Sequence, residues 1–249
     1  MSMELANVNI GLLGCGTVGA SLCKLIDEQS EAIAERTGLT LNVVMVAVRD
    51  VSRSRDVPID PSAFTDDSNL VIESPDVDVV VEVMGGINPS KELILKALEL
   101  GKPVVTANKE LLATHGDELY SSAKQSEVDL LFEAAVAAAI PIIRPLRESL
   151  VGEPITRVMG IVNGTTNFIL TKMTEENMPY ADALDEAQKL GYAESDPTAD
   201  VEGHDAAAKA AIIASLAFGG QVTLGDVHVE GITKITPEDI DFAHRLNHC

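Results

Sequence analysis

The sequence predicts an α/β protein, in which a doubly wound parallel sheet is followed by a smaller α+β domain. Strand-like and helix-like apolar patterns alternate over the first half of the 249 residues. This alternation is typical of parallel sheets covered by helices on both faces. After about residue 140 the alternation stops and helical patterns predominate. We therefore expect two domains, residues 1–138 and residues 139–249.

Strands of the first domain are predicted at apolar or β-branched runs, which lie at residues 8–13, 41–48, 77–84, 103–107 and 128–135. Helices are predicted from apolar spacing and from terminal Pro and Gly residues, at 18–37, from Asn88-Pro89 to Gly101, and at 109–125. The stretch 50–69 has no periodicity and is expected to be a loop.

The second domain has helical patterns at residues 141–150, 165–177, 180–190 and 204–218. The last of these is apolar almost all round, so we expect it to be buried. Residues 155–162 and 227–233 are the strand candidates of this half, and residues 194–203 read as a polar loop.

The charge balance excludes several classes of partner. Lys and Arg number 18 and Asp and Glu number 39, which gives a net charge of −21. A nucleic-acid backbone or an acidic membrane surface would repel such a chain. No apolar run approaches the roughly 20 residues of a membrane span. The acid excess has two interpretations: an ordinary solvated surface, or adaptation to a cell interior at high salt, where screening removes self-repulsion.

Cysteine usage and the N-terminus indicate a reducing cytoplasm. The three cysteines, Cys15, Cys23 and Cys249, have neither a metal-like spacing nor the even number of a disulfide scaffold. The first residues lack the basic and apolar regions of a signal peptide.

The segment Gly14-Cys15-Gly16-Thr17-Val18-Gly19 matches the pattern GxGxxG and lies between a predicted strand and a predicted helix. In this context the glycines allow a tight turn, a close approach to a pyrophosphate, and close helix–strand packing. The helix N-terminus supplies free N–H groups to the phosphates. We therefore predict a Rossmann-type dinucleotide site whose cofactor-binding residues include Gly14, Gly16, Thr17, Val18 and Gly19.

The choice between NAD and NADP depends on the residues after the second strand. An acid there would bind the ribose 2′-hydroxyl of NAD, whereas an arginine would bind the 2′-phosphate of NADP. Arg49 lies beside Asp50, and Arg53 and Arg55 follow. This basic cluster favours NADP with Arg49 as its ligand. The alternative is a solvated loop with internal ion pairs to Asp50 and Asp56.

Asp205 and Lys209 lie four residues apart, on one face of the apolar helix 204–218. One interpretation is an ordinary ion pair at an exposed first turn. The other is a catalytic amine, because loss of solvation favours the uncharged form of a lysine, which can accept a proton. The preceding loop carries carboxylates that would suit a substrate with an ammonium group, or that form a solvated acidic loop: Glu194, Asp196, Asp200 and Glu202.

Several segments together resemble the homoserine dehydrogenase family, over nearly the full length of the chain. They are the glycine loop, residues 80–86 (VVEVMGG), 104–109 (VVTANK), 132–136 (FEAAV), 160–167 (GIVNGTTN), and the polar series from Ala187 to Lys209. The resemblance implies NAD(P)-dependent interconversion of L-homoserine and L-aspartate 4-semialdehyde, in the biosynthesis of threonine, isoleucine and methionine. It also implies a homodimer.

Residue roles follow from the resemblance, position by position. Lys209 matches the residue that exchanges a proton with the substrate oxygen, and Lys109 matches a second active-site lysine near the nicotinamide. Glu194 and Asp205 match residues that bind homoserine, and Gly191 matches a cofactor contact. A sodium ion would be bound through the backbone of Glu133, Val136, Ala138 and Ile140.

The chain departs from the family in two respects. Ala138 replaces a glycine usual at that position of the sodium site. Family members also continue well beyond 249 residues, and many carry a regulatory domain that senses threonine. We therefore expect either a fragment or a truncated enzyme. The alternatives are a non-catalytic NAD(P)-binding protein or another amino-acid dehydrogenase.

Overall fold

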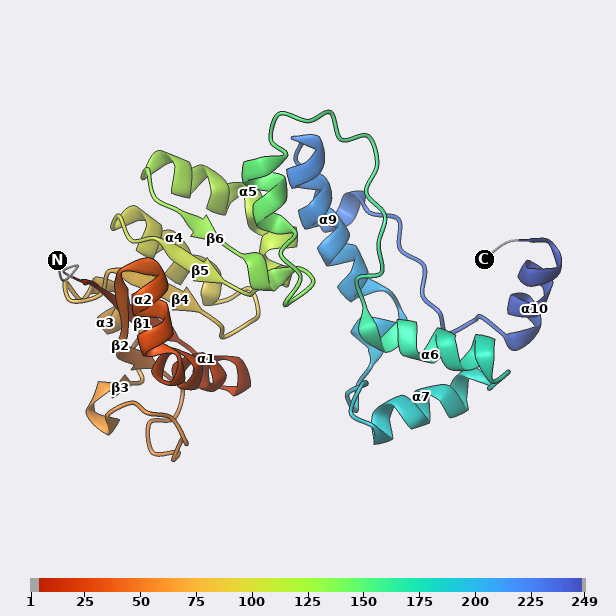
Figure 1. The fold of residues 1–249 in the computed structure, drawn as a ribbon, viewed down its shortest axis with the longest axis horizontal. Helices are drawn as coiled ribbons and strands as arrows, with labels where there is room; N and C mark the ends of the chain where they lie inside the picture. Colours follow the sequence, from red (N-terminus) through yellow and green to blue (C-terminus); the bar gives the residue numbers. More distant parts are fainter. Residues whose placement is uncertain (1–4, 248–249) are drawn as a thin grey trace. The chain divides into compact units, whose positions relative to one another are not determined.

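The structure, a computed structural model, describes residues 5–247 and divides into two compact units, residues 1–138 and 139–249 (Figure 1). Cys249 lies outside the described residues. Cys15 and Cys23 are free thiols. No helix among residues 5–247 combines the length and the apolar character that crossing a membrane requires.

The first unit contains a parallel sheet of six strands in the order β3-β2-β1-β4-β5-β6. Their bounds are β1 Ala6–Leu13, β2 Leu39–Ala47, β3 Phe64–Thr65, β4 Val79–Glu82, β5 Val104–Thr106 and β6 Leu130–Leu131. The order reverses between β1 and β4, which is the Rossmann arrangement. The prediction of a doubly wound parallel sheet is confirmed.

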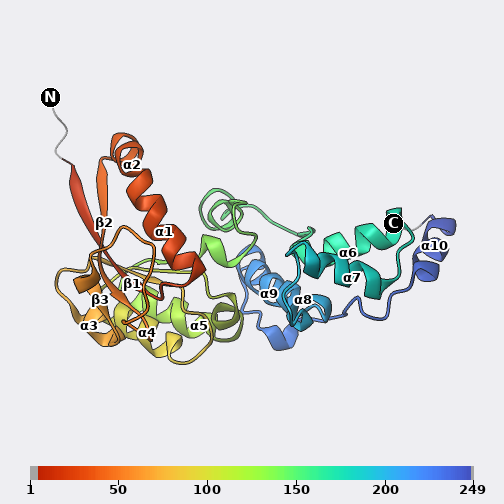
Figure 2. The ribbon, with the colours of Figure 1, turned by 90° about the horizontal axis from the view of Figure 1, so that it is seen from below.

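Helices cover both faces of this sheet. Helices α1 (Thr17–Glu28) and α2 (Ser30–Thr37) lie on one face, and α3 (Ser68–Glu73), α4 (Ser90–Glu99) and α5 (Lys109–Gln125) lie on the other (Figures 1 and 2). Helix α3 packs tightly on Gly11 of β1, where an added Cβ would lie 2.6 Å from Cγ1 of Val71 in α3. A larger residue there would displace α3 from the sheet.

The carboxyl ends of β1, β2, β4 and β5 meet at one edge of the sheet because the strands are parallel. The glycine loop follows β1, Arg49 follows β2, Met84 follows β4, and Asn108 follows β5. Ligands of doubly wound sheets bind at this edge, next to the point where the strand order reverses. The fold therefore brings together loops that are far apart in the sequence, such as those of Gly14 and Asn108, which are 94 residues apart.

The second unit consists of helices, turns and loops, and none of its described residues forms a strand. Its helices are α6 (Gly164–Glu175), α7 (Tyr180–Lys189), α8 (Thr198–Val201), α9 (His204–Phe218) and α10 (Pro237–Arg245). One hydrophobic cluster of this unit is formed by side chains of α6, α7 and α8 and the turn between the last two: Ile169, Met173, Ala183, Ala187, Ala193 and Val201. Two short turns complete the unit, a π-helical turn η3 at Pro145–Ser149 and a 3-10 turn η4 at Leu224–Asp226.

Three sequence predictions for the first unit were wrong in detail. Residues 18–37 form two helices, because Gln29 has non-helical backbone angles (φ −106°, ψ 10°). The predicted loop 50–69 contains a 3-10 turn η1 (Pro61–Ala63), the strand β3 and the start of α3. The predicted strand 128–135 pairs only at Leu130–Leu131, after which a 3-10 turn η2 (Glu133–Ala135) begins.

The strand predictions for the second unit were also wrong. Neither 155–162 nor 227–233 forms a strand, because within the described chain no neighbouring backbone completes a ladder with them. In the first segment Val158, Met159 and Ile161 are exposed. The predicted helix 141–150 is reduced to η3, and the loop 194–203 contains the short helix α8. Helix α9 is buried only along its first half, and Phe218 at its end is 52% exposed.

Candidate functional site

The glycine loop turns sharply between β1 and α1. Gly14 has φ +98°, which a side chain would disfavour, and a Cβ on Gly19 would lie 2.2 Å from the carbonyl oxygen of Gly14. A Cβ on Gly16, in contrast, would meet nothing within 4 Å. The outer glycines are therefore needed to close the turn, and the middle one leaves the backbone open to a ligand.

The start of α1 fits a phosphate group. Gly16 provides no side-chain cap, and the first turn of α1 contains no acidic residue, although the chain carries 39. The N–H groups of this turn are thus left for an anion. Thr17 begins the helix, and Val18 is 58% exposed beside it.

The loop after β2 separates its acid from its arginine. The carboxylate of Asp50 accepts hydrogen bonds from the backbone N–H (2.9 Å) and the hydroxyl (2.6 Å) of Ser52, and these bonds lower the pKa of Asp50. Arg55 donates to the backbone carbonyl of Asp50 (3.0 Å) and lies over the ring of Phe64. Arg49 is exposed. The expected ion pair of Asp56 exists, but its partner is Lys24 rather than an arginine.

Lys109 is the first residue of α5 and is exposed. It follows Asn108, whose side-chain oxygen accepts from the N–H of Leu111 (3.2 Å) and whose amide nitrogen donates to the carbonyl of Gly86 (2.6 Å). These bonds hold Lys109 at the carboxyl edge of the sheet, beside the loop that follows β4.

Asp205 and Lys209 form an ion pair of 2.7 Å in the second unit. The side chains are only 5% and 15% exposed, so this is not the solvated surface pair that their spacing also allows. The Lys209 Nζ also donates to the carbonyl oxygen of Val162 (2.7 Å). The Lys209 amine thus contacts two oxygen acceptors in a poorly exposed position, and its catalytic role stays a prediction.

Asn163 connects this pair to a second carboxylate. Its amide nitrogen donates to Oδ2 of Asp205 (2.9 Å) and to Oδ1 of Asp200 (2.6 Å). Its amide oxygen accepts from the N–H of Thr166 (2.8 Å) and so caps α6. One ammonium and two carboxylates therefore gather around a buried amide, at the meeting point of α6, α8 and α9.

This cluster can hold a cation and move a proton. Two carboxylates outweigh one ammonium, which leaves a local excess of negative charge that attracts an ammonium-bearing ligand. The amine of Lys209 is held by two oxygen acceptors in a poorly exposed position, and a lysine amine is a group that can transfer a proton. Cysteine chemistry is not favoured, because burial raises the pKa of Cys15, and burial together with the neighbouring Cys15 raises that of Cys23 to about 11.

Glu194 and Gly191 lie on the turn between α7 and α8 and are both exposed. Gly191 has φ +79° and ends α7. The turn is fixed to the start of α6, because the hydroxyl of Thr165 donates to the carbonyl of Tyr192 (2.7 Å). Glu194 thus lies two residues from a contact with the α6 N-terminus that also carries Asn163.

Comparisons with known proteins agree with these features. Residues 14–133 match the family model described as homoserine dehydrogenase, NAD binding domain, and residues 141–249 match the homoserine dehydrogenase model. A homoserine dehydrogenase of Corynebacterium glutamicum is 54% identical, over 97% of this chain and 54% of its own length. The crystal structure of a homoserine dehydrogenase from Thiobacillus denitrificans has a TM-score of 0.89 at 41% identity, covering 98% of this chain and 56% of that one.

A hyperthermophilic archaeal homoserine dehydrogenase, solved in complex with NADPH, has a TM-score of 0.77 at 33% identity and covers 92% of this chain and 75% of that one. The chain belongs to the homoserine dehydrogenase family. It spans about half the length of the curated relatives that it matches. The resemblance predicted from the motifs is therefore confirmed.

The residues expected to bind sodium in a homoserine dehydrogenase fall on both sides of the boundary between the units. Glu133, Val136 and Ala138 precede it, and Ile140 follows it. Within residues 5–247 no three His, Cys, Asp or Glu side chains gather into a side-chain metal site, which does not bear on a site built from backbone groups. The sodium site stays a prediction from the resemblance.

Two buried polar residues of the sites are not among the sequence predictions. Asn163 lies in an Asn-Gly-Thr sequence that matches a glycosylation sequon, but its position before a helical pattern was the signal of a helix cap. Glu82 is 0% exposed at the end of β4. The sequence feature that could have identified it is the single acidic residue at the end of a run of valines.

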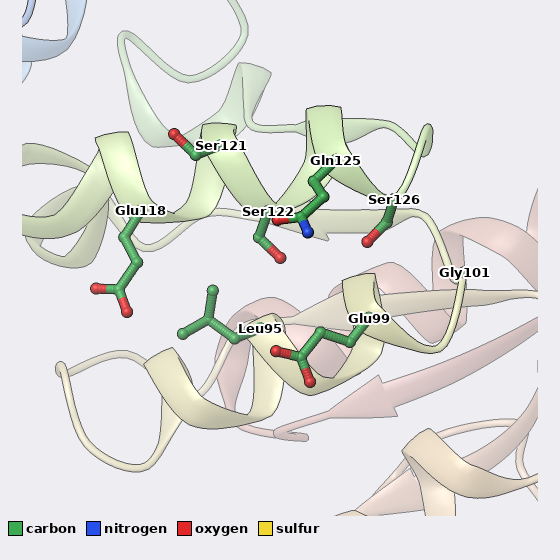
Figure 3. A pocket seen from close by; sticks show the side chains of 8 residues that line it. All are labelled: Leu95, Glu99, Gly101, Glu118, Ser121, Ser122, Gln125 and Ser126. Atoms are coloured by element: carbon green, nitrogen blue, oxygen red, sulfur yellow. The ribbon is translucent and has the colours of Figure 1, made fainter.

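A hollow of about 740 Å³ between α4 and α5 is unrelated to these sites (Figure 3). Gly101 and Ser126 at its rim precede β5 and β6, so the hollow lies at the amino ends of these strands, opposite the glycine loop. Its lining is polar and includes two acids: Leu95, Glu99, Gly101, Glu118, Ser121, Ser122, Gln125 and Ser126.

Proposed function

We propose that this protein catalyses the reversible, NAD(P)-dependent interconversion of L-homoserine and L-aspartate 4-semialdehyde. The observation that carries the proposal is the partly buried ammonium of Lys209, whose side chain is 15% exposed and which is paired with Asp205 at 2.7 Å and bonded to the carbonyl of Val162. A purely structural ion pair would not need a second carboxylate, Asp200, linked through Asn163. Family membership supports the same activity.

The proposed reaction divides the work between cofactor and protein. The nicotinamide, when bound, supplies or accepts the hydride. Lys209 gives a proton to the substrate oxygen when the aldehyde is reduced and takes it back in the reverse direction. Glu194 and Asp205 bind the ammonium group of the amino acid. Lys109 adds positive charge where the alkoxide develops.

NADP is the proposed cofactor in preference to NAD. The carboxylate of Asp50 is occupied by the N–H and hydroxyl of Ser52, so it is a poor partner for a ribose 2′-hydroxyl. Arg49 beside it is exposed and available to a 2′-phosphate. The glycine loop and Gly191 complete the proposed cofactor contacts.

The family resemblance supports further proposals that concern the whole protein. The reaction would serve the biosynthesis of threonine, isoleucine and methionine, in the cytoplasm and in a homodimer. A sodium ion bound by the backbone of residues 133–140 is proposed on the same ground.

The test is homoserine-dependent reduction of NADP, followed by the reduced-nicotinamide absorbance, in the parent protein and in Lys209→Ala and Lys209→Arg. We expect both variants to lose turnover by about 10²- to 10⁴-fold, as expected for loss of general acid–base catalysis. Lys209→Arg keeps a cation for Asp205 but cannot release a proton. NADPH binding should survive in both.

Lys189→Ala is the matched control, because Lys189 is an exposed lysine of the same unit that pairs with Asp185. It should turn over at the parent rate. Parent-like turnover of Lys209→Ala would refute the assigned role. A parent protein that binds NADPH without homoserine turnover would be a non-catalytic nucleotide-binding protein, and turnover of another amino alcohol would reassign the substrate.

A further inference from the structure

Glu82 is the last residue of β4 and its side chain is 0% exposed. The other residues of the strand are valines, so an apolar side chain would be the ordinary choice for this position. A buried carboxylate is costly unless hydrogen bonds compensate for the loss of water. The hydrogen-bond donors to the Glu82 carboxylate therefore indicate which parts of the chain this residue positions.

Three donors converge on the two carboxylate oxygens. Oε1 accepts from the backbone N–H groups of Met84 (2.8 Å) and Gly85 (3.1 Å), and Oε2 accepts from the hydroxyl of Thr106 (2.7 Å). Glu82 thus fixes the turn that follows its own strand and also binds the end of the neighbouring strand, β5.

The contacts continue into a closed ring. The oxygen of the Thr106 hydroxyl accepts from the N–H of Asn108 (3.0 Å), and the Asn108 amide donates to the carbonyl of Gly86 (2.6 Å). The ring joins the turn after β4 to the turn after β5. Lys109 begins α5 immediately after Asn108.

The position of this ring indicates its use. A dinucleotide lies across the carboxyl edge of such a sheet with its pyrophosphate at the glycine loop after β1. Arg49 and Asp50, after β2, mark the adenosine half. The turns after β4 and β5 lie on the other side of β1, where the nicotinamide half is expected.

We propose that Glu82 is a positioning residue for the nicotinamide half of the cofactor site, acting through the turn 83–86 and through Thr106 and Asn108. The proposal rests on the nicotinamide-cofactor part of the proposed function and is independent of the substrate. Glu82 need not touch the cofactor. Its role is to set the shape of the two turns that do.

The experiment compares the affinities of two ligands that differ only in the nicotinamide, NADPH and 2′-phospho-ADP-ribose. In Glu82→Gln an NH2 group replaces one carboxylate oxygen, so either the Thr106 hydroxyl or the backbone N–H groups of Met84 and Gly85 lose their acceptor. In Thr106→Val the hydroxyl is lost, whereas Thr106→Ser keeps it. We expect Glu82→Gln and Thr106→Val to weaken NADPH binding by about tenfold, the order expected for losing a hydrogen bond to a charged group. Binding of 2′-phospho-ADP-ribose should not change.

Thr106→Ser should retain the parent affinity for both ligands. Arg49→Ala is the control for the adenosine half and should weaken both ligands alike. Unchanged NADPH affinity in Glu82→Gln and Thr106→Val, or an equal loss for both ligands, would overturn the inference.

The binding measurements also separate this inference from the enzymatic proposal. A parent protein that binds NADPH but lacks homoserine turnover refutes the enzymatic proposal alone. A parent protein that binds neither ligand refutes both. If Glu82→Gln does not fold, Thr106→Val decides the question.

Discussion

Asn163 has two functions at the N-terminus of α6, because its oxygen caps the helix and its nitrogen bridges two carboxylates. Such a bridge is stable only while the residue can donate twice and accept once. Asn provides this combination, whereas Asp and Ser are equally good helix caps that lack it. Capping of α6 therefore requires only the side-chain oxygen of residue 163, whereas the link to the two carboxylates requires its NH2 group.

Replacing Asn163 by Asp tests that separation. The variant keeps an acceptor for Thr166 but sets a third carboxylate against Asp200 and Asp205, so we expect a loss of about 1–3 kcal/mol in the free energy of unfolding and a clear loss of homoserine turnover. Thr236→Val, which removes the cap of α10, should cost about 1 kcal/mol and leave turnover intact. Denaturant unfolding and the turnover assay measure both effects. Equal behaviour of the two variants would mean that Asn163 is only a cap.

At this scale the sequence predicts pairs that are close along the chain. Asp205 and Lys209 are found from their spacing of four, because a helix brings such residues together. The links from Asn163 to Asp200 and Asp205 span 37 and 42 residues, and that from Glu82 to Thr106 spans 24. No local pattern encodes these contacts, since only the folded chain brings their partners together.

Helix α10 illustrates how a local device stabilises an element. Asp239 accepts from the N–H (2.9 Å) and the hydroxyl (2.8 Å) of Thr236, and the hydroxyl accepts in return from the N–H of Asp239. The bonds from Thr236 lower the pKa of Asp239. A depressed carboxyl pKa contributes stability above the unfolded value of about 3.9, and this contribution is lost as the pH falls through the folded value.

Asp239→Asn should therefore weaken α10 at pH 7 but not at low pH. The measurement is hydrogen-exchange protection of the α10 amides, compared between parent and variant at the same pH. The ratio of parent to variant protection should exceed one at pH 7 and fall towards one as the pH drops through the lowered pKa of Asp239, where the parent carboxylate becomes protonated. Glu238→Gln on the same first turn, outside the capping box, is the control. A ratio independent of pH would contradict the electrostatic account.

Elements were predicted well where a helix end carries a chemical signal. Helix α5 begins at the capping residue Asn108, and α9 lies between Gly203 and Gly219, both with positive φ. The predicted bounds 109–125 and 204–218 agree with the structure. The strands expected at 155–162 and 227–233 failed for a different reason. Strand propensity describes one chain segment, whereas a strand also needs a second segment to accept and donate its hydrogen bonds.

The net charge of −21 affects the whole molecule, because like charges on a compact surface repel. Added salt should stabilise the fold by screening, with most of the gain below about 1 M, where the Debye length falls from about 10 Å at 0.1 M to about 3 Å. We expect the melting temperature to rise with NaCl and then level off. A continued rise above 1 M would favour adaptation to high salt. A melting temperature that falls or stays constant would contradict the screening account.

Val158, Met159 and Ile161 have exposed apolar side chains, through which separate molecules can associate. Added NaCl therefore has a second effect, which opposes its stabilisation of the fold. Electrostatic repulsion between the negatively charged molecules keeps these apolar surfaces apart. Salt screens this repulsion but leaves the hydrophobic attraction in place. Conditions that protect each molecule from unfolding therefore bring separate molecules into contact. As the salt concentration rises, the melting temperature is expected to rise and the solubility to fall. A suitable buffer for this protein therefore uses an intermediate salt concentration.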